Sequence, residues 1–232
     1  MKGNLLQAIW WSKWILGYYD ETWYCGLFSQ PPMDMICGEI TPSYSILKSQ
    51  DVARIKAVNS EMKCIYIIRN PIERAWSAIR FHAHSGVTIN LDSAEEIIAV
   101  LKHPGMLLRN DYERTIDTYL KHFDRSQILL CFYDAIKCDP LGLMASITNF
   151  LAIQPFNDSL IDSKVLVNPS PKHSMPINVQ DYLLETYSPM INRIAQTLGS
   201  YARTWSSTET NSTPLSPEKN SPHLPPPALH PS

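Results

Sequence analysis

Arg69 and Ser77 are the residues whose types and spacing point most directly to chemistry. Arg69 follows the apolar run 64–68, and Ser77 comes eight residues later. A guanidinium forms two-pronged contacts with phosphate or sulfate oxygens, and a serine hydroxyl donates to the same anions. The pair therefore predicts an anion-binding site. The alternative is that Arg69 pairs with a carboxylate and Ser77 is a small residue on a packed helix, because structural ion pairs also form at strand ends.

The residues around Arg69 predict the elements that position it. Residues 64–68, Cys-Ile-Tyr-Ile-Ile, are apolar and rich in β-branched side chains, which predicts a strand buried on both faces. Asn70 suits the cap of a helix, Pro71 its first position, and Glu73 the third position of a capping box. The segment is therefore predicted to be a strand, a tight turn and a helix. Arg69 then stands at the carboxyl end of a strand, where open α/β sheets bind ligands.

Further elements are predicted on both sides of this segment. Residues 35–38 resemble a second core strand, and a helix capped by Ser49 leads from it to the strand at 64–68. Together they would form a βαβ unit, which favours a parallel sheet. A third strand is expected at 127–133. Four more helices are predicted, over residues 92–102, 111–123, 139–151 and 178–198, with Asn178 as the cap of the last and Gly199 at its end.

Four segments, taken together, resemble one known family. The run Arg69 to Ser77, Arg-Asn-Pro-Ile-Glu-Arg-Ala-Trp-Ser, resembles the 3′-phosphate-binding motif of sulfotransferases that use 3′-phosphoadenosine 5′-phosphosulfate (PAPS). Residues 38–44 resemble the G-E-K-T-P-x-Y segment of the bacterial and heparan-sulfate-type members. Residues 111–123 and 127–140 resemble a helix and a strand that follow in the same family. The match covers roughly residues 23–199, and its specificity comes from the agreement of four segments in order.

The resemblance implies a fold, a reaction and site residues. The fold would be a three-layer α/β/α domain with a short parallel sheet, like the P-loop nucleotide-binding folds. The reaction would transfer a sulfuryl group from PAPS to a hydroxyl or amine acceptor, by in-line displacement and without a metal. Arg69 and Ser77 match the two 3′-phosphate ligands. Tyr112 matches a tyrosine near the donor, with a core aromatic as the alternative. Lys172 is a possible basic donor contact, with a solvated lysine as the alternative.

Elements that the family uses for the 5′-phosphosulfate are not recognisable. The resemblance implies a Gly-rich loop near the amino terminus, but no Lys-x-Gly-Thr or Walker-like pattern lies between Gly17 and Gly26. A Lys-Glu strand is also unrecognisable, and Ile40 stands where the family often has lysine. We expect the chain to be an amino-terminally truncated fragment. The alternative is a divergent, non-catalytic module that binds a 3′-phosphonucleotide or a partner protein.

The sequence does not identify the catalytic base or the acceptor. His82, His84 and Glu39 are candidates for the base by position alone, and none is assigned. Carbohydrate is indicated as the acceptor only by the likeness of residues 38–44 to heparan-sulfate-type enzymes. A phosphotransferase of related fold is disfavoured because no Walker lysine or Mg²⁺-binding carboxylate pattern is present.

Composition sets the remaining expectations. Of the 232 residues 44% are hydrophobic, and the net charge of −2 gives no electrostatic argument for nucleic acid or an anionic membrane. The five cysteines lack metal-ligand spacing, which favours buried free thiols and a cytoplasmic setting. Residues 1–22 form a Trp-rich segment whose apolar run, Leu5 to Tyr19, is too short to span a bilayer. It is expected to be an amphipathic helix packed on the domain at 23–203, with membrane-interface binding as the alternative. Residues 204–232, rich in Pro, Ser and Thr, are expected to be a disordered tail.

Overall fold

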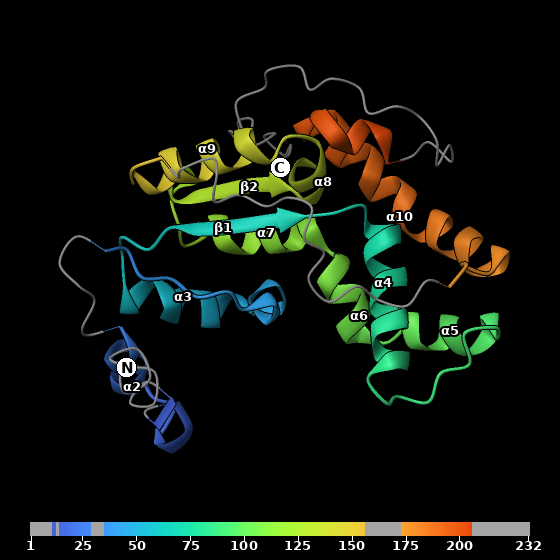
Figure 1. Ribbon diagram of the computed structural model, residues 1–232, viewed down its shortest axis with the longest axis horizontal. Coiled ribbons are helices and arrows are strands. Elements are labelled where there is room, and N and C mark those ends of the chain that lie inside the picture. The colour runs from blue at the N-terminus through green and yellow to red at the C-terminus, as the bar shows by residue number, and fades with distance from the viewer. Residues whose placement is uncertain (1–10, 13, 29–34, 156–172, 206–232) are drawn as a thin grey trace, which may run out of the picture.

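The computed structural model of the chain describes residues 11–12, 14–28, 35–155 and 173–205. Two parallel strands, β1 (Cys64–Ile68) and β2 (Ile128–Phe132), lie between helices (Figure 1). α7 runs beside β1 and α9 beside β2, which is the α/β/α arrangement expected from the sequence (Figure 1). The remaining elements are α2 (Glu21–Leu27), η1 (Pro42–Ile46), α3 (Ser49–Val58), α4 (Pro71–His84), α5 (Ala94–Leu101), α6 (Pro104–Asn110), α7 (Tyr112–Leu120), η2 (Arg125–Gln127), α8 (Tyr133–Cys138), α9 (Pro140–Leu151), α10 (Ile177–Leu198) and η4 (Ser200–Thr204).

The parallel register brings the two strand ends together. Cys64 lies opposite Ile128 and Ile68 opposite Phe132, so Arg69 and Tyr133 follow paired residues at the same edge of the sheet. Both strands occur where the sequence predicted them. The prediction that β1 is buried on both faces is wrong. Ile65 and Ile67 are 38% and 45% exposed, because only the alternate side chains of this strand face the core.

The predicted strand at 35–38 is also wrong, and with it the βαβ unit that depended on it. This segment has no regular structure, and Met35 and Ile36 are 63% and 57% exposed. Side-chain hydrogen bonds to the neighbouring Glu39 stabilise this part of the chain instead of backbone hydrogen bonds to another strand. The Glu39 carboxylate accepts from the hydroxyls of Tyr24, Tyr44 and Thr41, at 2.6, 2.7 and 3.0 Å.

Helix α4 begins as its sequence predicts. The Asn70 side chain accepts a hydrogen bond from the Ile72 N–H at 3.0 Å, and Pro71 occupies the first helical position, where it needs no donor. The predicted capping box does not form, because Glu73 pairs with Arg69 instead. The buried face of α4 packs on α10 and α5 in the main core, which comprises Ile68, Ile72, Ala75, Trp76, Ile79, Ile97, Leu101, Met106, Tyr112, Leu130, Val179, Leu183, Tyr187, Met190, Ile191, Ile194, Ala202 and Trp205.

The other helices follow the predictions with local differences. Ser93 caps α5, Asp111 caps α7 and Asp139 caps α9, each by accepting a backbone N–H. Ser49 is the first residue of α3 and not its cap, and α10 begins before Asn178. The short helices α6 and α8 were not predicted, since each has only one or two turns and no apolar period of its own.

The two ends of the described chain differ in packing. Near the amino terminus Trp11 and Leu16 are 50% and 79% exposed, while the Trp14 ring contacts the Trp23 ring of α2 at 5.2 Å between centroids. At the other end Trp205 is only 4% exposed, so the folded part extends past residue 203. None of the helices in the described ranges is long and apolar enough to cross a membrane.

Candidate functional site

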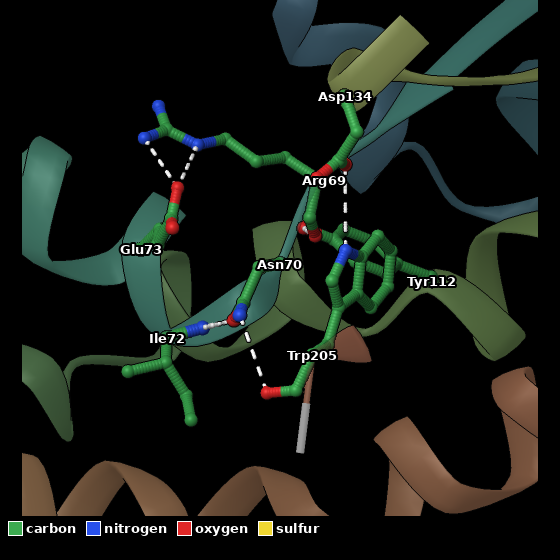
Figure 2. A network of polar contacts seen from close by, with 7 residues as sticks. All are labelled: Arg69, Asn70, Ile72, Glu73, Tyr112, Asp134 and Trp205. Carbon is green, nitrogen blue, oxygen red and sulfur yellow. Dashed lines mark hydrogen bonds and ion pairs between the residues drawn. The ribbon is translucent and has the colours of Figure 1, made fainter. Parts of the chain in front are cut away.

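Arg69 occupies the carboxyl end of β1, as the sequence predicts. Its Nε and Nη2 atoms donate to Oε2 of Glu73 at 3.2 and 2.9 Å, and its guanidinium lies 4.8 Å from the centroid of the Tyr133 ring. Figure 2 shows the side chain extending across the start of α4 to Glu73. The arginine therefore does pair with a carboxylate, which is the alternative that the sequence left open. Because the Arg69 side chain is 25% exposed, an external anion can still reach it.

Ser77 lies on the same face of α4 as Glu73. The two residues are four positions apart, so their side chains are neighbours along the helix surface. Each side chain also leans toward the amino-terminal end of the helix, which is the end where Arg69 lies. Arg69 precedes α4 and reaches this line of side chains through its ion pair with Glu73. Glu73 thus lies one helical turn before Ser77 and contacts Arg69, while joint binding of an anion by Arg69 and Ser77 stays a prediction.

Tyr112 supports the backbone of the strand end. Its hydroxyl donates to the Arg69 carbonyl at 2.9 Å, and its ring packs edge-on against Tyr66 at 6.1 Å between centroids. The side chain is 2% exposed, and burial raises the pKa of Tyr112 well above its ordinary value. Tyr112 is therefore a core aromatic, which is the alternative that the sequence left open, and it also fixes the position of the Arg69 backbone. Contact between Tyr112 and a donor stays a prediction.

The segment after β2 forms the second wall of the site. Tyr133 and Asp134 begin α8 directly after Phe132, and Asp134 accepts a hydrogen bond from the Trp205 indole N–H at 3.3 Å. Burial raises the pKa of the Asp134 carboxyl, and nearby Glu73 acts in the same direction. Sequence reasoning missed Glu73, Asp134 and Trp205 as neighbours of Arg69. The predicted strands could have indicated Asp134, because residues that follow adjacent parallel strands meet at one edge of the sheet.

Lys172 lies outside the described residues, so its predicted role is not placed in the structure. The description resumes at His173, whose carbonyl accepts a hydrogen bond from the Trp76 indole N–H at 3.3 Å. His173 Nε2 also lies 3.3 Å from Asp92 Oδ1. The residue after Lys172 is therefore hydrogen-bonded to α4 through Trp76, which precedes Ser77 in sequence.

Two of the three residues considered as a base lie away from the start of α4. His82 and His84 lie 11 and 13 positions after Pro71, which places them about 17 and 20 Å along the helix axis. The Glu39 carboxylate accepts hydrogen bonds from the hydroxyls of Tyr24, Thr41 and Tyr44. The described residues contain no cluster of three or more His, Cys, Asp or Glu side chains arranged to hold a metal ion.

Comparison with known proteins assigns the family. The family model described as Sulfotransferase domain matches residues 39–165, more than half of the chain. This chain belongs to the sulfotransferase domain family. The matched region includes both strands and the Arg69 site.

Individual sulfotransferases are similar over part of their length. The heparan sulfate glucosamine 3-O-sulfotransferase 3B1 of Mus musculus is 24% identical over 139 residues, which are 57% of this chain and 35% of that protein. The Homo sapiens protein of the same name is 24% identical over 145 residues, 59% of this chain and 36% of that protein. The chain spans about a third of the length of these curated relatives.

A solved structure confirms the fold. A sulfotransferase from Alicyclobacillus acidocaldarius matches with a TM-score of 0.56 at 21% sequence identity, over 77% of this chain and 70% of that one. The similarity extends beyond the segments that carry the family motifs. The architecture is therefore the three-layer α/β/α sulfotransferase fold with a short parallel sheet, as expected.

Proposed function

We propose that this chain is the 3′-phosphonucleotide-binding part of a sulfotransferase that uses PAPS as its donor. Arg69 and Ser77 would bind the 3′-phosphate, and the acceptor would be a hydroxyl or amine, with carbohydrate favoured by the names of the relatives. The observations that carry the proposal are the position of Arg69 at the carboxyl end of a parallel strand and its contact with Glu73, which lies one turn before Ser77 on α4. The carboxyl edge is where α/β sheets bind nucleotides.

The residues present fit a phosphate group. Arg69 supplies a fork of donors that matches phosphate oxygens, and the Tyr133 ring and Tyr112 limit its orientations. The amino end of α4 lies at the same place, and its macrodipole favours negative charge. PAPS, when bound, supplies the sulfuryl group. The chain's own contribution would be to hold the donor by its 3′-phosphate and so to position that group for transfer.

Binding of 3′-phosphoadenosine 5′-phosphate tests the proposal, with adenosine 5′-phosphate as the ligand that lacks the 3′-phosphate. We expect calorimetry to show selective binding that falls at least about tenfold in Arg69→Ala, because a charge-assisted, two-pronged contact is lost. Arg193→Ala is the matched control, since Arg193 also pairs with a glutamate, Glu113, at 2.7 Å but lies on α10. Equal binding of both nucleotides, or equal effects of both variants, contradicts the proposed role of Arg69.

A second candidate function is binding without sulfuryl transfer. It is favoured by the printed sequence, in which no Gly-rich 5′-phosphosulfate loop is recognisable. Turnover of PAPS with a heparan-type oligosaccharide separates the two candidates. Release of 3′-phosphoadenosine 5′-phosphate that depends on the acceptor and on Arg69 supports the enzyme. Selective nucleotide binding without such release supports the binding module.

A further inference from the structure

The carboxyl-terminal turn η4 returns the chain to the Arg69 site. α10 ends at Leu198 and is followed by Gly199, whose backbone has a φ of +59° and a ψ of −135°, a conformation that side-chain-bearing residues rarely adopt. η4 follows directly and packs on the end of β2. The Phe132 ring contacts Tyr201 at 5.8 Å and Trp205 at 5.6 Å between centroids. The final described residues are therefore part of the sheet edge that carries the site.

Trp205 contacts both segments that form this edge. Its backbone carbonyl accepts a hydrogen bond from Asn70 Nδ2 at 3.4 Å, and its indole N–H donates to Asp134 Oδ2 at 3.3 Å. Asn70 is the residue after Arg69, and Asp134 is the residue after Tyr133, on whose ring Arg69 lies. Figure 2 shows Trp205 between the Asn70 and Asp134 side chains. One residue thus connects the turn after β1 to the start of α8, which follows β2.

We propose that Trp205 is a positioning residue for the Arg69 anion site, holding the segments after β1 and β2 in fixed relative positions. Asn70 has two bonds, one to Trp205 and one that caps α4 through Ile72, so its position sets both the start of α4 and the direction of Arg69. Asp134 is fixed in the same way on the other wall. The identity of the bound anion rests on the proposed function. The positioning role of Trp205 does not depend on it.

The arrangement has a physical reason. The loop ends of a two-stranded sheet receive support from only one neighbouring strand, so their positions depend on packing from elsewhere. Trp205 provides this packing with a ring that is 4% exposed and with two polar bonds in defined directions. An aliphatic residue at this position could still accept from Asn70 through its backbone carbonyl, but it could not donate a hydrogen bond to Asp134.

Amide hydrogen exchange of the ligand-free protein tests the positioning role. We compare Trp205→Ala with Leu183→Ala, a fully buried residue of α10 in the same core, at equal distance from each variant's melting temperature. Exchange of the amides at 70–74 and 133–135 is expected to rise about tenfold more in Trp205→Ala than in the control. Trp205→Phe keeps the ring and the backbone carbonyl. It is expected to affect 133–135 and to leave 70–74 nearly unchanged.

The outcomes separate this inference from the proposed function. Exchange that rises equally along α4, α5 and α10 in both alanine variants, or that does not rise at the two segments, overturns the positioning role. A local rise supports that role even if no variant and no wild-type protein binds 3′-phosphoadenosine 5′-phosphate, a result that would overturn only the proposed function. If the wild-type protein binds 3′-phosphoadenosine 5′-phosphate, Trp205→Ala must bind this nucleotide more weakly than Leu183→Ala does. Equal affinities of the two variants refute the inference.

Discussion

Glu73 lies where it would compete with a bound phosphate for Arg69. Its carboxylate accepts from two donors of the guanidinium at 3.2 and 2.9 Å. A phosphate oxygen on the other side of the same group would lie about 2.8 Å from its donor, which leaves about 6 Å between the two anions. We therefore predict that Glu73→Gln binds 3′-phosphoadenosine 5′-phosphate more tightly than wild type.

Two contributions set the size of this effect. The ion pair that the phosphate must weaken contributes about 0.2–1 kcal/mol, because Arg69 is 25% and Glu73 57% exposed. The repulsion between a carboxylate and a phosphate dianion at about 6 Å is about 1.4 kcal/mol in water, and salt at physiological concentration about halves it. The sum is about 1–1.7 kcal/mol, which corresponds to about 5- to 20-fold in affinity.

Calorimetric titration at two salt concentrations checks this prediction. The advantage of Glu73→Gln over wild type should shrink at high salt, because the repulsive part is screened. Glu61→Gln is the matched control, since Glu61 is an exposed glutamate at the amino end of β1, away from Arg69. Unchanged or weaker binding by Glu73→Gln would refute the competition. Glu73 would then orient the Arg69 guanidinium for the phosphate and would not compete with the phosphate for it.

Two further predictions concern the support of the site. Tyr112→Phe removes the hydrogen bond to the Arg69 carbonyl, so the free energy of unfolding in urea should fall by about 0.5–1.5 kcal/mol, and an unchanged value would show that this bond contributes nothing. Burial raises the pKa of Asp134, so at pH values just above the ordinary aspartate pKa the folded protein binds more protons than the unfolded chain. The stability of the wild-type protein therefore falls as the pH rises through this range. The melting temperature of Asp134→Asn minus that of wild type should therefore increase between about pH 3 and pH 7, and a constant difference would contradict this assignment.

The position of Arg69 between a strand and a helix was predictable because it depends on neighbours in sequence. The apolar run at 64–68 and the Asn70-Pro71 start of the next helix are local signals, and both appear in the structure as expected. The eight-residue spacing of Arg69 and Ser77 is local too. Once 71–84 is a helix, the four-residue spacing of Glu73 and Ser77 places Ser77 one turn after Glu73 on the same face.

The incorrect predictions came from interactions that compete with a local pattern. Glu73 suits a capping box by position, but the guanidinium of Arg69 offers it a charged partner in place of a backbone N–H. Residues 35–38 have the composition of a strand, yet a strand needs a neighbour for its backbone groups. In the described structure that segment is held through Glu39 and its hydroxyl partners.

The sequence by itself determined the two strands, the principal helices, the position of Arg69 and the family. Only the tertiary structure decided what surrounds the arginine. Tyr112 lies 43 positions from Arg69, and Trp205 lies 135 positions from Asn70 and 71 from Asp134. Contacts at such separations depend on how whole elements pack, because no local period or cap relates residues so far apart in the chain. The position of the Arg69 guanidinium is therefore encoded locally, while its environment is set by the fold.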